Sequence, residues 1–241
     1  MSRDRLYENE IGTTGTFEFN AAVADVFPDM LRRSIPGYEA SLRAIRSLAR
    51  RHVQRNSICY DLGCSLGAAT LAIRHGIVTE GCRIIAIDSA LPMVERCKEI
   101  IANDETKIPV EVVAGDIREM NIMDASMVVM NYTLQFLPVD ERAALIGKIG
   151  DGMRPGGVLV LSEKVIDEDP GIEALLVDLH HDFKRRQSYS ELEISRKRAA
   201  IENVLVPESI ATHKDRMVKA GFKHVGVWLR YFNFVSLVAI K

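Results

Sequence analysis

The stretch Tyr60-Asp61-Leu62-Gly63-Cys64-Ser65-Leu66-Gly67 decides the fold class, because it joins an apolar strand expected over 57–61 to a helix expected over 67–75. Glycine lets the backbone approach a ligand closely, and the start of a helix offers N–H groups without partners in the helix. Ser65 stands at the second glycine of the dinucleotide fingerprint, and no lysine follows Gly67 as in a P-loop. The loop alone indicates either a ligand site or a tight turn.

Short apolar segments alternate with helical patterns beyond this loop. Strands are expected over 83–87, 110–114, 127–131 and 158–162, with helices over 93–102 and 139–153. Strands that are apolar on both faces suit a parallel sheet covered by helices on each side. Strands over 222–231 and 233–240 are separated by so little chain that they must form an antiparallel hairpin. The sequence therefore predicts an α/β fold, with a seven-stranded, mostly parallel sheet whose last strand is antiparallel.

Helical segments flank this sheet on the N-terminal side and before the hairpin. Residues 1–55 are expected to form a helical cover, with a helix over 20–30 interrupted by Pro28 and another over 38–53. Residues 165–206 form a helical insertion, in which 170–206 reads as one long helical stretch, and a further helix covers 207–220. We expect one elaborated domain over 1–241. The insertion is a predicted dimer interface, because it has more apolar residues than one helix must bury: Leu175, Leu176, Leu179, Phe183, Leu192 and Ile194.

Composition excludes several classes of protein. The chain has 241 residues, 31 Lys and Arg, and 33 Asp and Glu, so its net charge is −2, which gives no support for direct nucleic-acid binding. No stretch approaches the ~20 apolar residues of a membrane span, and the N-terminus lacks a secretory signal. The four cysteines form no C-x-x-C pair, so no zinc or other metal site is expected. We expect a cytoplasmic protein without membrane contact.

Polar residues follow four strands of the expected sheet. Gly63, Asp88, Asp116 and Asn131 all stand at carboxyl ends of strands, where parallel sheets bind their ligands. Asp88 can accept both hydroxyls of a ribose, and Asp116 can accept an adenine amino hydrogen with the Ile117 N–H facing the ring. Each acid alone could be a helix cap, but four such residues together favour a nucleoside site.

These motifs resemble those of the class I S-adenosylmethionine-dependent methyltransferases. The matches are D-x-G-x-x-x-G at 61–67, the acid at 88, Gly115-Asp116 and Arg154-Pro155-Gly156-Gly157. The resemblance implies a Rossmann-like fold and binding of S-adenosyl-L-methionine, with contacts that include Cys64, Ser65 and Ser89. Relatives are expected to have Asn-Ser where this chain has Ser89-Ala90, so Ser89 would hold the ribose by its hydroxyl or backbone.

Longer segments are similar to the family of carboxy-S-adenosyl-L-methionine synthases, over nearly the whole chain. They lie at 60–70, 129–137, 189–195, 197–198 and 232–239. The resemblance implies that S-adenosyl-L-methionine and prephenate give carboxy-S-adenosyl-L-methionine and phenylpyruvate. In the mechanism proposed for the family, prephenate loses carbon dioxide and hydroxide, and the deprotonated sulfonium methyl captures the carbon dioxide. The product would supply a downstream tRNA carboxymethyltransferase that forms 5-oxyacetyl uridine at the wobble position.

The same resemblance implies roles for two further residues. Arg198 would bind the added carboxylate, reaching the site of the neighbouring subunit in a homodimer, and Tyr38 would lie near the bound substrate. No catalytic residue is assigned, because no general base is evident. His180 and His181 are adjacent on a helix, so we expect that they do not face one site together. The predicted binding residues are Tyr38, Gly63, Cys64, Ser65, Asp88, Ser89, Asp116, Ile117, Asn131 and Arg198.

Two other functions remain open on the sequence. The first is a conventional methyltransferase for a small molecule or tRNA, although Asn131-Tyr132 departs from the N-P-P-Y motif of amine-methylating enzymes. The second is a non-enzymatic protein that only binds S-adenosyl-L-methionine. Neither alternative needs an arginine beside the methyl group, so the region around Arg198 separates the synthase from both alternatives.

Overall fold

The computed structural model describes residue 4, residue 6 and residues 17–202 and 204–241. Its sheet follows the order β3-β2-β1-β4-β5-β8-β7, and β8 alone runs antiparallel to its neighbours. This confirms the predicted mostly parallel sheet with an antiparallel last strand. A short strand, β6 (Glu208–Ser209), pairs in parallel with the end of β5, so the described residues form eight strands where the sequence predicts seven. The other strands are β1 (Ile58–Leu62), β2 (Arg83–Asp88), β3 (Val110–Ala114), β4 (Ala125–Asn131), β5 (Met153–Ile166), β7 (His224–Tyr231) and β8 (Phe234–Ile240).

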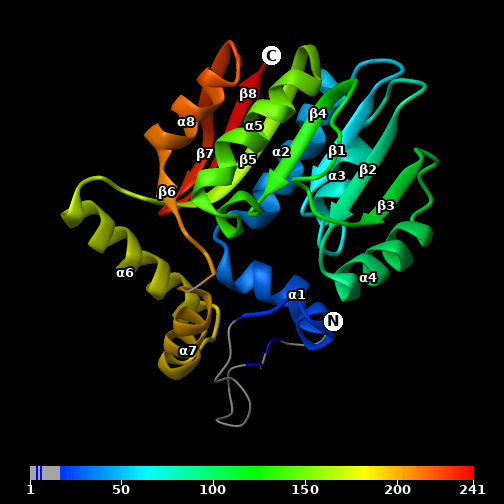
Figure 1. The fold of residues 1–241 in the computed structure, drawn as a ribbon. Coiled ribbons are helices and arrows are strands. Elements are labelled where there is room, and N and C mark those ends of the chain that lie inside the picture. Colours follow the sequence, from blue (N-terminus) through cyan, green and yellow to red (C-terminus); the bar gives the residue numbers. More distant parts are fainter. Residues whose placement is uncertain (1–3, 5, 7–16, 203) are drawn as a thin grey trace.

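Helices cover both faces of the sheet (Figure 1). Successive side chains of β4 alternate between the faces, and all except that of Asn131 are buried. Met127 and Val129 pack with α2 (Tyr38–His52) and α3 (Ala68–Gly76), whereas Val128 and Met130 pack with α5 (Val139–Gly152). Two more helices complete the layers, α4 (Leu91–Ala102) and α8 (Ile210–Lys219). The apolar runs that the sequence shows are thus explained by burial on two sides.

Three further helices lie beyond the carboxyl ends of the parallel strands, at the bottom of Figure 1. They are α1 (Ala21–Ser34), α6 (Pro170–Arg186) and α7 (Glu191–Glu202). The prediction that Pro28 interrupts the first helix is wrong, because α1 continues to Ser34. Buried Phe27 and Met30 hold the chain on both sides of the proline, and this packing overrides the local preference.

The long helical stretch expected over 170–206 is two helices. Ser188 has a positive φ of 63°, which no helix residue adopts, so α6 ends at Arg186 and the chain turns before α7. Strand β5 is also longer than the expected 158–162, since β4 and β8 pair with its two sides. Within the described ranges, no helix is both long and apolar enough to cross a membrane.

Candidate substrate-binding cavity

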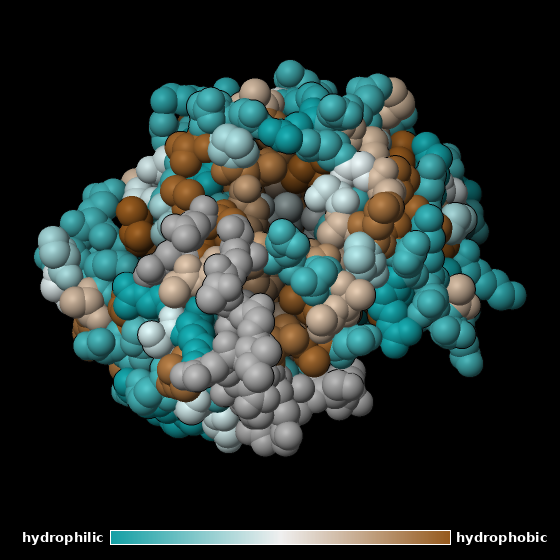
Figure 2. Space-filling model, turned by 60° about the horizontal axis from the view of Figure 1, so that its bottom comes forward, coloured by the Kyte–Doolittle hydropathy of each residue, from teal (hydrophilic) through white to brown (hydrophobic). Residues whose placement is uncertain are grey.

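A cavity of about 630 Å³ opens where the parallel strands end, between the sheet and helices α1, α6 and α7. Figure 2 looks at this side of the molecule and shows hydrophobic residues gathered around a recess. Sheets of this kind bind ligands at this edge. The structure brings all ten residues predicted from the sequence to its wall: Tyr38, Gly63, Cys64, Ser65, Asp88, Ser89, Asp116, Ile117, Asn131 and Arg198.

The loop between β1 and α3 forms one end of the cavity and leaves no room for larger residues. Gly63 has a φ of 83°, and its N–H donates to the Ile87 carbonyl at 2.8 Å. A Cβ at Gly63 would lie 2.3 Å from the Thr133 side chain, and one at Gly67 would lie 2.8 Å from Cys97 Sγ. The glycines are therefore required by close packing as well as by their backbone conformation.

Asp88 ties the end of β2 to this loop. Its Oδ2 accepts from the Ser65 N–H and its Oδ1 from the Ala90 N–H, both at 2.9 Å. Burial raises the pKa of the Asp88 carboxyl, while these backbone hydrogen bonds oppose the shift. Each carboxylate oxygen retains a further lone pair, so Asp88 can also accept the hydroxyls of a ribose.

Asp116, which follows the end of β3, and Asn131, which ends β4, also line the cavity. Asp116 accepts hydrogen bonds from the backbone N–H and the Nε of Arg118, and the side-chain bond lowers the pKa of its carboxyl. The buried Oδ1 of Asn131 has no hydrogen-bond partner among the described residues. An orphaned buried acceptor on a cavity wall is suited to a ligand donor.

Aromatic rings line the middle of the cavity. The Tyr132 ring lies between those of Tyr38 and Phe234, with centroid separations of 6.4 Å and 6.0 Å. All three side chains are buried, and burial is the largest reason why the pKa values of both tyrosines lie above the ordinary value. These buried rings give this part of the cavity an apolar wall.

Two buried carboxyl groups stiffen the sheet edge below the cavity. Asp61 accepts from Thr70 Oγ1 at 2.5 Å, and Glu163 accepts from the backbone N–H groups of Leu134 and Gln135. Burial raises the pKa of Asp61 to about 7 and that of Glu163 to about 8. The Glu163 contacts fix the short 3₁₀ helix η1 (Leu134–Phe136), whose neighbours line the cavity.

Basic residues gather at the other end of the cavity. They come from β5, α6 and α7, and Arg198 lines the cavity of its own chain. His180 Nε2 lies 2.8 Å from the Ser34 carbonyl oxygen, which can only accept, so Nε2 is assigned the proton. Burial lowers the pKa of His180 to about 3, so this ring is neutral. The basic set is Lys164, Lys184, Lys197 and Arg198.

The expectation that His180 and His181 do not face one site is wrong. Both line the cavity, with ring centroids 6.4 Å apart. Adjacent helix residues project about 100° apart around the axis, and this cavity is wide enough to receive both directions. His180 is buried on the inner side and packs against Phe234 at 4.8 Å, whereas His181 is half-buried.

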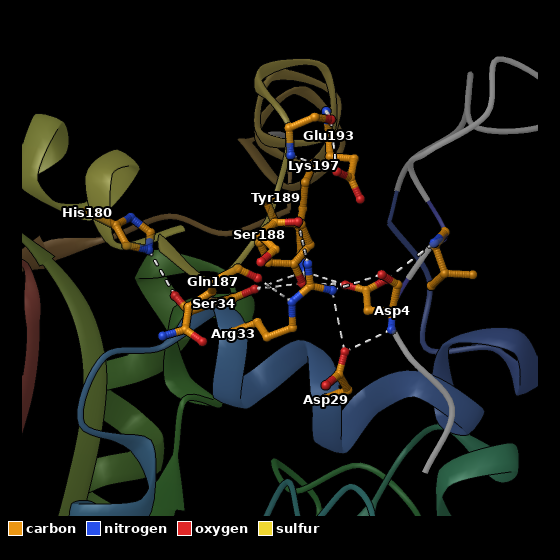
Figure 3. Close-up of polar contacts among 12 residues, drawn as sticks. Asp4, Asp29, Arg33, Ser34, His180, Gln187, Ser188, Tyr189, Glu193 and Lys197 are labelled. Carbon is orange, nitrogen blue, oxygen red and sulfur yellow. Dashed lines mark hydrogen bonds and ion pairs between the residues drawn. The ribbon is translucent and has the colours of Figure 1, made fainter. Parts of the chain in front are cut away.

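A buried polar cluster fastens α7 to α1 and to Asp4 (Figure 3). The Asp4 carboxylate accepts from the Tyr189 hydroxyl at 2.5 Å and from Lys197 Nζ at 3.2 Å. Arg33 donates to the carbonyl oxygens of Asp4, Gln187 and Ser188. This cluster fixes the part of α7 that carries Arg198.

Sequence reasoning gave no role to two residues that the structure places on the cavity wall. Lys184 lies in a run of basic residues that reads as a solvated helix face, yet it is 8% exposed. Asn233 is expected to begin the last strand and has no predicted role, yet it precedes β8 and is fully buried on the cavity wall. Among the described residues, no group of three or more His, Cys, Asp or Glu side chains could hold a metal ion.

Curated relatives with high sequence identity over the whole chain are named carboxy-S-adenosyl-L-methionine synthase. A family model described as a methyltransferase domain matches residues 59–157. The chain is 55% identical to a carboxy-S-adenosyl-L-methionine synthase of Vibrio atlanticus, over 99% of this chain and 98% of that protein. It is 54% identical to the protein of that name from Salmonella paratyphi C, over 99% of this chain and 97% of that protein.

Solved structures show the same fold at low sequence identity. A human N-acetylserotonin methyltransferase in complex with S-adenosylmethionine matches with a TM-score of 0.60 at 16% identity, covering 92% of this chain and 55% of that one. An O-methyltransferase family protein from Burkholderia thailandensis matches with a TM-score of 0.64 at 16% identity, covering 92% and 60%. These likenesses establish the Rossmann-like methyltransferase fold.

Proposed function

Because the chain belongs to the family of carboxy-S-adenosyl-L-methionine synthases, we propose that its cavity converts S-adenosyl-L-methionine to carboxy-S-adenosyl-L-methionine, with prephenate as the carboxylate donor. The observation that carries this proposal is that the two ends of the cavity differ in chemistry. A glycine loop and Asp88 suited to a nucleoside stand at one end, and Arg198 with buried lysines stands at the other. A methyltransferase that gives its methyl away has no need of a cationic end.

Different wall residues would contact different parts of the bound molecule. Asp88 would accept the ribose hydroxyls, while Asp116 and the Ile117 N–H would contact the adenine. The loop of Gly63, Cys64 and Ser65 would pass close to the methionine part. Arg198 would form charge-assisted hydrogen bonds with the new carboxylate, which S-adenosyl-L-methionine lacks.

The proposed reaction balances without an added oxidant or base. The bond between prephenate and its ring carboxylate breaks, the electron pair aromatises the ring, and hydroxide leaves. The sulfonium methyl gives a proton to this hydroxide, forming water, and its carbon forms a bond to the released carbon dioxide. Phenylpyruvate is the second product. The positive sulfur makes the methyl acidic, and holding both reactants in a dry cavity keeps carbon dioxide from escaping.

Neutral His180 fits this scheme as a wall residue. Its pKa of about 3 and its hydrogen bond to Ser34 leave it uncharged at neutral pH. With hydroxide as proton acceptor, the chain needs no general base of its own.

The experiment is to release the bound small molecule from purified protein and identify it by mass spectrometry, before and after prephenate is added. Carboxy-S-adenosyl-L-methionine and phenylpyruvate are the expected products. If S-adenosyl-L-methionine is recovered unchanged with prephenate present, the proposal fails. Release of S-adenosylhomocysteine with a methylated acceptor would favour the conventional methyltransferase instead.

We further propose a homodimer formed through α6 and α7. Ile172 and Leu175 on α6 and Leu192 on α7 are 45–51% exposed, and a partner subunit would cover these apolar side chains. Sedimentation should give a dimer, and Leu175→Glu should shift it toward monomer. A wild-type monomer at working concentration would contradict the proposal.

The family resemblance implies that Arg198 acts across this dimer. A mixed dimer of Arg198→Ala and Asp88→Asn chains tests this directly. If Arg198 acts in the partner's site, the mixture regains one working site per dimer, whereas neither variant works alone. If Arg198 acts in its own chain, the mixture stays inactive.

The product would pass to a separate tRNA carboxymethyltransferase in the cytoplasm. The four buried free cysteines support a reducing location. The near-neutral charge supports a chain that makes a small molecule and leaves tRNA binding to the next enzyme. Retention of the chain on a tRNA column at physiological salt would contradict this.

A further inference from the structure

Lys184 is a buried lysine that faces the cavity without an acidic partner. Among the residues that the structure describes, none forms an ion pair or hydrogen bond with its ammonium group. Burial, followed by the positive charges of Lys197, Lys164 and Arg198, lowers its pKa to about 7. Lys197, by contrast, is compensated by the Asp4 carboxylate at 3.2 Å. An uncompensated buried cation on a cavity wall calls for an anion from outside the chain.

Asn233 supplies a second, independent sign of a ligand at the same place. Its side chain is fully buried, and neither amide atom has a hydrogen-bond partner among the described residues. Its neighbour Phe234 packs on His180 with centroids 4.8 Å apart, and His180 lies one helical turn before Lys184. The orphaned amide and the orphaned ammonium therefore belong to one region of the wall.

Two other charged groups, Glu173 and Lys164, lie on this wall. Glu173 also lines the cavity, but its Oε2 accepts from the Asp167 N–H at 2.8 Å. Lys164 pairs with Phe234 across β5 and β8, which adds a positive charge at the same edge of the sheet. The local charge is thus positive, and the Lys184 ammonium and the Asn233 amide are two donors here that have no hydrogen-bond partner among the described residues.

We propose that Lys184 and Asn233 form a carboxylate subsite for the second substrate, distinct from Arg198. Resting on the proposed function, the subsite holds the carboxylate that prephenate keeps, while the other carboxylate leaves toward the methyl group. The ligand class is a 2-keto acid anion. Lys184 supplies charge and the Asn233 NH₂ supplies a directed hydrogen bond, so two carboxylates of one donor meet two separate cationic groups.

The test compares Lys184→Met, Lys184→Arg and Asn233→Leu with wild type, and uses Lys214→Met on exposed α8 as the matched control. Because a charged hydrogen bond contributes ~1.5–3 kcal/mol, Lys184→Met should raise KM for prephenate about tenfold or more. Phenylpyruvate should inhibit the variant correspondingly less. The Kd for S-adenosyl-L-methionine should stay within about twofold, and Lys184→Arg should restore most of the KM.

The outcomes separate this subsite from the function on which it rests. If wild type converts prephenate and Lys184→Met keeps the wild-type KM, the subsite is wrong and the function stands. An equal loss of S-adenosyl-L-methionine affinity would also overturn it, by making Lys184 a general structural residue. If wild type itself converts nothing, the proposed function fails and the subsite falls with it. Circular dichroism confirms that each variant is folded.

Discussion

The ammonium of Lys197 lies 3.2 Å from the carboxylate of Asp4, a residue 193 positions earlier in the chain. The two side chains are only 6% and 1% exposed, so water compensates neither charge. Arg198 follows Lys197 directly, which means that this ion pair positions the end of the cavity where we propose that the carboxylate binds.

We predict that Asp4→Asn lowers the free energy of unfolding by about 3 kcal/mol, because it leaves the buried Lys197 charge without its partner. In a protein of this size that corresponds to a melting temperature about 6–12 °C lower. Asp215→Asn breaks an exposed ion pair with Lys219 and is the matched control, with an expected change below about 0.5 kcal/mol. Equal melting temperatures of the two variants would refute the prediction.

The same pair should show a defined pH dependence. Burial alone would raise the pKa of Asp4, but the Lys197 charge and the Tyr189 hydrogen bond outweigh it and the pKa is lowered. A lowered carboxyl pKa stabilises the fold above the unfolded value of about 3.9, and this stabilisation disappears as the pH falls through the folded value. Denaturant titrations should therefore show the full difference between wild type and Asp4→Asn at neutral pH, and a shrinking one below pH ~4.

Lys184→Met should stabilise the ligand-free protein while it weakens binding of the donor. The folded pKa of Lys184, about 7, lies below its unfolded value, so the charged form opposes folding. Each kilocalorie regained should raise the melting temperature by about 2–4 °C. The gain should be complete below pH 7 and vanish as the pH rises toward the unfolded pKa of ~10.4. A pH-independent gain would mean that packing and not charge is responsible.

Gly63→Ala should abolish most binding of S-adenosyl-L-methionine, as measured by calorimetry. The new Cβ would lie 2.3 Å from Thr133 side-chain atoms, and the alanine backbone would have to adopt a φ of 83°. Strain of this kind costs about 1–3 kcal/mol, enough to distort the loop and lower affinity at least tenfold. Gly147→Ala in α5 is the control, since nothing lies within 4 Å of the added carbon. It should bind normally and be more stable by ~0.4–1 kcal/mol.

Asp88→Asn should weaken S-adenosyl-L-methionine binding about tenfold to a hundredfold. An amide offers one oxygen where the carboxylate offers two, so either the Ser65 N–H or the Ala90 N–H loses its acceptor. Glu111→Gln, an exposed acid on the neighbouring strand β3, serves as the control. Wild-type affinity of Asp88→Asn would remove this residue from the site.

The ligand-binding edge could be predicted from sequence because each element there has a local signature. Gly63, Asp88, Asp116 and Asn131 each follow an apolar run, and the order of the strands then brings them together. The break between α6 and α7 could not be predicted in this way. It rests on the positive φ of Ser188, where the sequence has neither glycine nor proline to mark a turn.

Lys184 and Asn233 escaped prediction for a different reason. Their distinguishing property is the absence of a partner in three dimensions, and a pattern of residue types cannot show this. Lys184 stands beside Arg185 and Arg186, which are exposed, so the sequence gives all three the same appearance. Burial of one member follows from the rotation of α6 against the cavity.

The contact between Asp4 and α7 also sets the order in which the protein can mature. As the chain is synthesised, Asp4 emerges long before Lys197. The strands on either side of the glycine loop are completed between the two. Until α7 follows, the apolar lining of the cavity faces water and can engage other chains, as incomplete domains do. A polypeptide released before residue 197 should therefore depend on chaperones, whereas the finished chain closes over this surface by itself.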